Sequence, residues 1–188
     1  LKFGVEFDRD ENNNLCYTKE AAHSVRRILH SGGDATGKMI EQALCRKVKE
    51  NENIEIYEQT DAVQLLVNSN ECKGVIVFNN DIGEYETIYS PAVILATGGI
   101  GQLYKYTTNP VGATGDGIAL AYEAGAVMQD MEFVQFHPTA LAIDDDVNRF
   151  LISEAVRGEG AKLCDADGVE FMSKYDERKE LAPRDIVT

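Results

Sequence analysis

The chain has 188 residues, 44% of them hydrophobic, which is enough to bury a sizeable core in one domain or in parts of two. Its 32 acidic residues outnumber 18 basic ones, and the resulting formal charge of −14 argues against binding a nucleic acid, which needs a basic face. The longest uninterrupted apolar run near the middle, residues 92–96, is far shorter than the roughly 20 residues that span a bilayer, so we expect no membrane segment.

The four cysteines are far apart in the sequence and form no Cys-x-x-Cys pair. Neither a disulfide framework nor a zinc site is therefore indicated, and we predict no metal site. Reduced, structural thiols are typical of a cytoplasmic protein, which is the location we expect. The chain begins with Leu1 rather than Met and has no basic-then-apolar signal pattern, so we interpret it as a piece of a longer polypeptide.

The first 33 residues are polar and irregular except for a basic patch at residues 23–30, which contains two Arg and two His. Such a patch in an acidic chain could bind an anion. Arginines on a solvated loop are the commoner explanation, and the sequence leaves both open.

A helix of about four turns is predicted after this patch, with Asp34 or Thr36 as its N-cap. Apolar residues then recur at the three, four and seven spacing of one helical face. This predicted buried stripe comprises Met39, Ile40, Ala43, Leu44, Lys47 and Val48.

Residues rich in β-branched and aromatic side chains predict strands in the next part of the chain. The first of these strands covers residues 54–58. Three further runs are separated by turn residues and predict an antiparallel three-stranded meander. These runs are residues 62–67, 74–78 and 85–89.

Residues 92–96 are apolar on both faces, which predicts a central parallel strand. Thr97, Gly98 and Gly99 follow this strand directly. Glycines at such a position let the backbone approach a ligand closely, and ligands of open α/β sheets bind at the carboxyl ends of strands. We therefore expect a ligand contact here.

Residues 114–125 predict a second helix with apolar residues on one face. Asp116 lies at its start, and its carboxylate either caps the helix or contacts a ligand. Helices that flank a parallel strand and a meander indicate an α/β fold.

Three blocks near the C-terminus combine His, Arg, Glu and hydroxyl side chains with Gly and Pro. They are residues 132–139, 153–161 and 181–185, with a solvated acidic loop predicted at Asp144–Asp146. A single His or Arg is usually structural, but this cluster suits a pocket that presents cations to a small anion. We predict a dicarboxylate pocket and place a domain transition near residue 131.

Seven ordered blocks spread over nearly the whole chain resemble the succinate dehydrogenase and fumarate reductase flavoprotein family. The blocks are Glu20–Ser24 with Arg27–His30, Asp34–Gly37, Ala96–Gly99, Gly115–Gly117, Phe133–Thr139, Ser153–Ala161 and Leu181–Asp185. Within the family, Ala140-Leu141 and Ala155-Val156 favour the branch that oxidises L-aspartate over the succinate and fumarate enzymes.

The resemblance implies FAD as the cofactor. It implies that the flavin contacts in this chain are Thr97, Gly98, Gly99 and Asp116. The Gly-x-Gly-x-x-Gly turn that binds the FAD pyrophosphate does not occur in the sequence. We therefore expect that this chain supplies only part of a flavin site.

The resemblance also implies the roles of five substrate-site residues. His137 would hold a substrate carboxylate, Ser153 and Glu154 would contact the substrate, and Glu20 would orient it. Arg184 would donate or accept a proton, although a guanidinium with a pKa above about 12 is a poor base in water and would otherwise be only a clamp. That role requires a closed, dry site in which neighbouring Glu and Arg side chains relay the proton. Ser153 stands where the family commonly has Thr.

The implied domains are the C-terminal part of a Rossmann-like FAD-binding domain, residues 1–130, and the first part of an α+β capping domain, residues 131–188. The FAD-binding part would carry the antiparallel three-stranded meander. We expect this portion to be inactive by itself.

The implied activity is flavin-dependent oxidation of L-aspartate to iminoaspartate, the first step toward quinolinate and NAD. L-aspartate or fumarate would be the ligand, and quinolinate synthase a partner. One alternative is the flavoprotein subunit of a fumarate reductase or succinate dehydrogenase. Another is a flavin-free fragment that binds a dicarboxylate or a partner.

Overall fold

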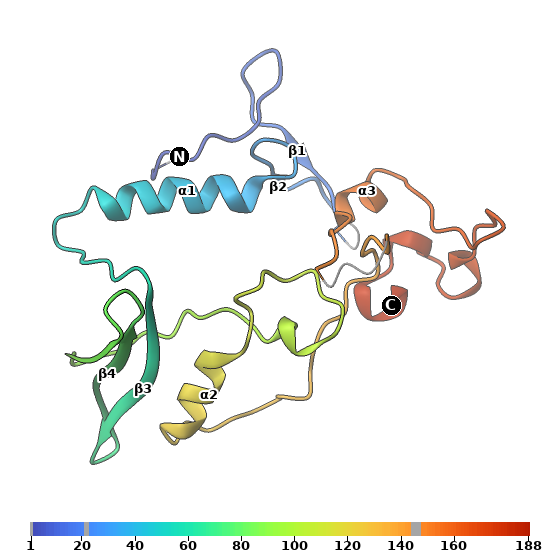
Figure 1. Ribbon diagram of the computed structural model, residues 1–188. Helices are drawn as coiled ribbons and strands as arrows, with labels where there is room; N and C mark the ends of the chain where they lie inside the picture. Colours follow the sequence, from blue (N-terminus) through green and yellow to red (C-terminus); the bar gives the residue numbers. More distant parts are fainter. Residues whose placement is uncertain (1, 21–22, 144–147) are drawn as a thin grey trace. The chain divides into compact units, whose positions relative to one another are not determined.

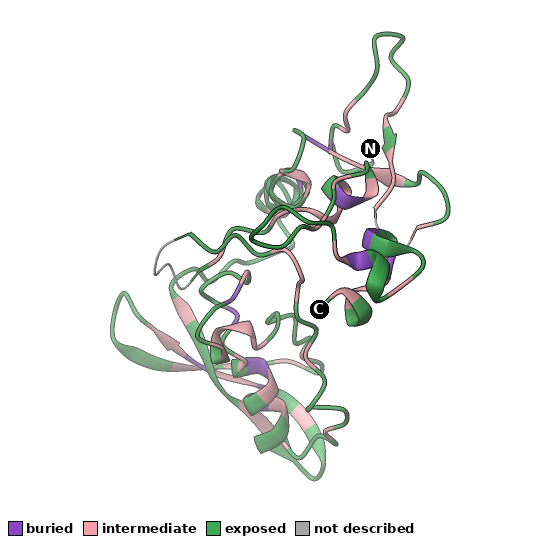
Figure 2. Cartoon of the chain, turned by 90° about the vertical axis from the view of Figure 1, so that its right-hand side faces the viewer, coloured by how far each residue is buried: buried purple, intermediate pink, exposed green. Residues whose placement is uncertain are grey.

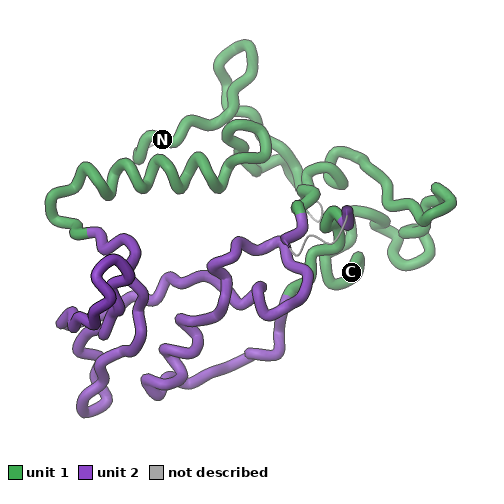
Figure 3. The backbone as a smooth tube through the Cα atoms, viewed as in Figure 1, with its two compact units in different colours: residues 1–55, 135–141, 150–188 green, residues 56–134, 142–149 purple. Residues whose placement is uncertain are grey.

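The computed structural model describes residues 2–20, 23–143 and 148–188 (Figure 1). The chain forms two compact units, which are coloured separately in Figure 3. The first unit comprises residues 1–55, 135–141 and 150–188, and the second comprises residues 56–134 and 142–149. Ala21, Ala22 and the loop Asp144–Asp146 lie outside the described residues. The boundary near residue 131 does not coincide with this division and stays a prediction.

The first unit consists of one long helix and several short elements. Helix α1 spans Thr36–Lys49, and strands β1 (Tyr17–Thr18) and β2 (Ile28–Leu29) pair antiparallel. The C-terminal part adds α3 (Glu154–Gly158), η2 (Met172–Lys174), η3 (Lys179–Leu181) and α4 (Arg184–Val187). The buried apolar side chains of this unit include Val5, Ala43, Met172 and Ala182.

Helix α1 forms where it was predicted, but its predicted cap is wrong. Ala35 occupies the N-cap position, and no side chain caps the helix. The hydroxyl of Thr36 instead accepts a hydrogen bond from the Ser31 N–H, at 3.1 Å. Thr36 thus fastens the preceding loop, and neither Asp34 nor Thr36 supplies the N-terminal cap.

The predicted buried stripe on α1 is only partly buried. Ala43 is 1% exposed, whereas Ile40 and Leu44 keep 36% and 42% of their surface exposed. The periodicity correctly predicts one apolar face, but the described residues of this unit cover only its centre.

The second unit is built on the predicted meander, which is confirmed. Strands β3 (Thr60–Asn68), β4 (Glu71–Asn79) and β5 (Glu84–Tyr89) form an antiparallel sheet in the order β3-β4-β5. Phe78 lies opposite Tyr85 in the register, and their ring centroids are 4.9 Å apart. A Cβ at Gly74 would lie 2.1 Å from the carbonyl oxygen of Ile88 in the neighbouring strand β5, so this position of β4 has room only for glycine.

Helix α2 (Asp116–Glu123) packs against β3 and buries Leu120, and the short helix η1 (Gly101–Leu103) precedes it. Buried stretches are small in both units, as the purple segments in Figure 2 show. None of the described helices is both long and apolar enough to cross a membrane.

Two predicted strands do not form in the described part of the chain. Residues 54–58 and 92–96 are irregular, and Ile94 is 90% exposed. A strand needs a neighbour that satisfies its N–H and C=O groups, and the residues of one segment do not encode that neighbour. The predicted central parallel strand is therefore wrong for this structure, whereas the α/β class with a three-stranded antiparallel sheet is confirmed.

Candidate active site

Arg184 is held in a fixed orientation by two other side chains of the first unit. Pro183 is the N-cap of α4, with φ −58°, and places Arg184 at the first helical position. The Nε and Nη2 groups donate to the two carboxylate oxygens of Glu154 at 2.9 and 3.0 Å, and Nη1 donates to Oε1 of Gln135 at 2.9 Å. A guanidinium has five N–H donors, so residues that the structure describes use three and leave two for a ligand.

Glu154 lies between two arginines. Ser153 caps helix α3 by accepting a hydrogen bond from the Ala155 N–H at 3.2 Å, so Glu154 projects from the first turn. Its Oε1 also accepts from Nη2 of Arg157 at 2.8 Å. The hydrogen bonds from Arg184 lower the pKa of Glu154, against the opposing effect of burial, and the charge of Arg157 lowers it further. Glu154 is therefore an anion at neutral pH.

Arg157 is a buried support for Glu154. Its exposed fraction is 3%, and its Nη1 donates to the Glu180 carbonyl oxygen at 3.1 Å. The Glu180 carboxylate is itself buried and accepts from the Leu163 N–H at 3.2 Å, with the Lys162 ammonium at 3.6 Å. Burial disfavours the charge on Glu180, but these donors outweigh it and lower its pKa. Residues 157–163 and η3 thus form one rigid support behind the Glu154–Arg184 pair.

His137 is positioned as a neutral hydrogen-bond donor. Its Nδ1 accepts the Thr139 N–H at 3.2 Å, so the proton of the neutral ring resides on Nε2. Burial, together with the positive charge of Arg184, lowers the pKa of His137 below its ordinary 6.5. The Thr139 hydroxyl donates to the Ile152 carbonyl at 2.9 Å, which ties this segment to the start of α3. His137 can therefore present Nε2–H to a carboxylate near Glu154 and Arg184.

Glu20 belongs to the same group of residues. Its negative charge raises the pKa of Arg184, although the hydrogen bonds from Arg184 to Glu154 contribute most to that shift. The structure thus brings all five predicted substrate-site residues, Glu20, His137, Ser153, Glu154 and Arg184, into one unit. The sequence missed Gln135, Glu180 and the support that Arg157 gives to Glu154. Of these three contacts, only the one between Glu154 and Arg157 could have been predicted locally, because side chains three residues apart on a helix are neighbours.

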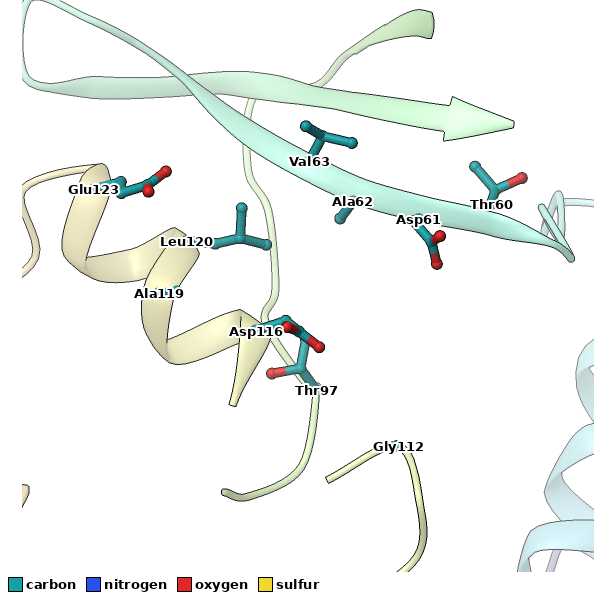
Figure 4. A pocket seen from close by; sticks show the side chains of 10 residues that line it. All are labelled: Thr60, Asp61, Ala62, Val63, Thr97, Gly112, Asp116, Ala119, Leu120 and Glu123. Atoms are coloured by element: carbon teal, nitrogen blue, oxygen red, sulfur yellow. The ribbon is translucent and has the colours of Figure 1, made fainter. Parts of the chain in front are cut away.

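The predicted flavin contacts lie in the second unit, beside a cavity of about 730 Å³ (Figure 4). The cavity lies between β3 and α2, and Thr97 and Asp116 line it close to one another. Gly98 and Gly99 do not line it, but a Cβ at either position would meet nothing within 4 Å. Their backbone therefore remains open to a ligand.

The cavity fits one part of FAD better than another. Asp116 is not a helix cap: Gly115 holds that position, and the Asp116 carboxylate accepts a hydrogen bond from the Thr114 hydroxyl. The cavity is also lined by the carboxylates of Asp61 and Glu123. Carboxylates and hydroxyls suit the ribityl or ribose hydroxyls of FAD, whereas the carboxylates repel its pyrophosphate. The described residues contain no cluster of His, Cys, Asp and Glu that could hold a metal ion.

Residues 1–188, the whole chain, match the model of one protein family, the FAD binding domain. The chain belongs to the FAD binding domain family. The match supports FAD as the cofactor of this family member.

Several curated relatives of this FAD binding domain are L-aspartate oxidases. They come from Synechocystis sp. (50% identical over 190 residues), Nicotiana tabacum (the chloroplastic form 2-b, 45% over 199) and Bacillus subtilis (43% over 188). Each alignment covers 100% of this chain but only 34%, 30% and 35% of the respective relative. The chain thus spans about a third of the length of the curated relatives it matches.

Solved flavoprotein structures share this fold. A structure of E. coli quinol fumarate reductase matches with a TM-score of 0.86 and 28% identity, and covers 99% of this chain and 33% of that chain. A Mycobacterium smegmatis Sdh1 structure matches with a TM-score of 0.72 and 31% identity, over 98% of this chain and 32% of that chain. These matches confirm the predicted relationship to the succinate dehydrogenase and fumarate reductase flavoproteins.

Proposed function

We propose that this chain is the part of an FAD-dependent L-aspartate oxidase that carries most of its substrate site. The observation that supports the proposal best is the Arg184–Glu154 ion pair, with neutral His137 close enough for its pKa to respond to both charges. The relatives named L-aspartate oxidase, at 43–50% identity, favour this activity over the more distant fumarate reductases.

The reaction removes a hydride from Cα of L-aspartate and a proton from its nitrogen, and iminoaspartate remains. FAD, when bound, accepts the hydride. The side chains of this unit bind and orient the substrate. The His137 Nε2–H and the Ser153 hydroxyl donate to a substrate carboxylate, and the remaining N–H groups of Arg184 attract the second one. The carboxylate of Glu20 offers an acceptor for the substrate ammonium.

Arg184 is the proposed proton donor when the site reduces fumarate, and the proton acceptor in the reverse direction. Its raised pKa makes loss of a proton to water unfavourable. A transfer through Arg184 therefore needs prompt replacement of its proton. Glu154 is an anion at rest and contacts two of the Arg184 nitrogens directly, so it would relay a proton that it first takes up from another donor. Exclusion of water would strengthen this coupling.

The alternative activity is that of a fumarate reductase or succinate dehydrogenase flavoprotein subunit. The structural matches support it, and the Glu154–Arg184–His137 group would bind succinate or fumarate equally well through their carboxylates. A flavin-free fragment that binds a dicarboxylate or a partner is a further alternative, which the lack of a Gly-x-Gly-x-x-Gly motif in this sequence favours.

We also propose the division of the parent protein into an FAD-binding part, residues 1–130, and a capping part, residues 131–188. Imines hydrolyse in water, so an enzyme that consumes iminoaspartate quickly, such as quinolinate synthase, is the proposed partner on the route to quinolinate and NAD. A cytoplasmic location remains our prediction from the cysteines.

Flavin reduction tests the proposed activity. A full-length flavoprotein that contains this chain is mixed with L-aspartate without oxygen, and the flavin absorbance is followed. Bleaching by L-aspartate, followed by recovery with fumarate, supports the oxidase. Bleaching by succinate but not by L-aspartate would establish the alternative enzyme, and a colourless full-length protein would establish the flavin-free one.

A further inference from the structure

Arg26 and Glu159, which are not themselves assigned to the substrate, form a bidentate ion pair. The Nη1 and Nη2 groups of Arg26 donate to the two oxygens of Glu159 at 2.7 and 2.9 Å. Their side chains are 56% and 46% exposed. Exposed ion pairs usually contribute little to stability, but a bidentate fork fixes the relative position of the two segments that it joins.

The same two segments touch through their backbones. Gly158 is the last residue of α3, and a Cβ there would lie 2.3 Å from the Lys19 carbonyl oxygen and 3.1 Å from backbone atoms of Glu20. The Lys19 backbone also favours the charged form of the Glu159 carboxylate, which adds to the effect of Arg26 in lowering the pKa of Glu159. Glu159 therefore binds the chain after Glu20, at Arg26, and the neighbouring Gly158 packs against the chain at Lys19 and Glu20.

This arrangement connects Glu20 to the substrate site through α3. The helix has five residues, with Glu154 at its start and Gly158 at its end, so its two ends cannot move independently. Antiparallel pairing of β1 with β2, and the Arg27 N–H donated to the Thr18 carbonyl at 3.0 Å, fix the base of the segment. The position of the Glu20 backbone relative to Glu154 and Arg184 is thus set by Gly158 and Glu159.

We propose that Arg26, Gly158 and Glu159 are positioning residues that fix the backbone of Glu20, whose carboxylate is the proposed acceptor for the substrate ammonium. This inference rests on the proposed L-aspartate oxidation. A second carboxylate in a site for dianions repels succinate and fumarate but attracts the ammonium of L-aspartate. The ion pair would therefore act on the choice of substrate and not on the chemical step itself.

The test compares two substrates in the full-length flavoprotein. Arg26→Ala should lower kcat/KM for L-aspartate about tenfold, the size expected when a charge-assisted hydrogen bond is misplaced. Most of that loss should lie in KM. Fumarate reduction should not fall, because fumarate has no ammonium for Glu20 to bind and is repelled by its carboxylate. Arg26→Lys keeps the charge without the fork and should lose activity with L-aspartate in the same direction. Lys47→Ala removes an equally exposed ion pair, to Glu50 at 2.6 Å, and should change neither activity.

The same Arg26→Ala substitution in a Glu20→Gln variant shows whether Arg26 acts through Glu20. If Arg26 acts through Glu20, Arg26→Ala adds no further loss with L-aspartate in that background. Equal losses with both substrates, a fully additive loss with Glu20→Gln, or unchanged L-aspartate kinetics would each overturn the positioning role. A parent protein that does not oxidise L-aspartate at all would overturn both this inference and the proposed function.

Discussion

Arg184 binds Glu154 side-on, with Nε and Nη2 donating to the two oxygens of one carboxylate at 2.9 and 3.0 Å. The two residues are 30 positions apart, and each starts a helix, α4 or α3. The pKa of Glu154 is lowered and that of Arg184 is raised, mainly by these hydrogen bonds. The pair therefore stays ionised at neutral pH, and its geometry rather than its charge alone is available to orient a substrate.

Replacement of Arg184 by Lys tests this geometry. A lysine keeps the positive charge, but its single ammonium cannot reach both Glu154 oxygens and Gln135 at once. In the full-length flavoprotein we expect Arg184→Lys to reduce fumarate turnover by about a hundredfold or more, the range for a misplaced proton donor. FAD should stay bound, because its candidate contacts lie in the other unit. Turnover within about threefold of the parent would move the proton transfer to another residue, with Glu154 the next candidate.

Removal of the His137 ring should act mainly on binding. His137 offers a neutral Nε2–H to a carboxylate that is present in both the ground state and the transition state. A hydrogen bond to a charged group contributes about 1.5–3 kcal/mol, so His137→Ala should raise KM for L-aspartate about tenfold or somewhat more. An unchanged KM in His137→Ala would contradict the carboxylate role.

The site residues that stand in short, ordered sequence blocks were predictable from the sequence. His137, Glu154 and Arg184 stand in recognisable blocks, and the structure brings them together. The Arg26–Glu159 fork joins residues 133 positions apart, and Arg157 contacts a carbonyl 23 positions away. No local pattern encodes such contacts, because they depend on how two distant segments meet.

The fold shows the same limit. Turn residues and strand-forming side chains predicted the meander correctly, since each of its strands pairs with its neighbour in sequence. Residues 92–96 have a similar apolar character, but a parallel strand depends on partners that are distant in sequence. Local periodicity can therefore establish a hairpin and only suggest a parallel strand.

The lowered pKa of His137 predicts a pH dependence of stability. Between the folded value and the ordinary 6.5, the unfolded chain binds a proton that the folded chain does not bind. Stability therefore rises with pH through this window and is fully present above 6.5. Urea unfolding on either side of the window should show a smaller change for His137→Gln than for the parent. An equal pH response in His137→Gln and the parent would exclude His137 as its source.

The chain expressed by itself should retain little FAD. Its cavity offers Thr97 and Asp116, but the carboxylates of Asp61 and Glu123 would repel the pyrophosphate, and no Gly-x-Gly-x-x-Gly turn is present to bind it. Flavin absorbance is measured after exhaustive dialysis and compared with the protein concentration. Near one equivalent of flavin per chain would show that the described cavity suffices.

Gly117 in α2 lies against Thr97, so a substitution there tests whether the position of Thr97 matters for flavin binding. A Cβ at Gly117 would lie 1.8 Å from Oγ1 of Thr97, closer than any real contact, so one of the two must move. We expect Gly117→Ala to lower the free energy of unfolding by about 1–3 kcal/mol, the usual cost of overpacking, and to weaken FAD binding as Thr97 is displaced. Gly37→Ala is the matched control, because a Cβ in that helical position of α1 meets nothing within 4 Å and should stabilise the helix or leave it unchanged.

Urea titrations and flavin binding isotherms in the full-length protein measure the effects of Gly117→Ala on stability and on FAD affinity. Weaker FAD binding with an unchanged KM for L-aspartate would assign Thr97 to the flavin alone, whereas unchanged flavin affinity in a destabilised Gly117→Ala would remove Thr97 from the flavin contacts.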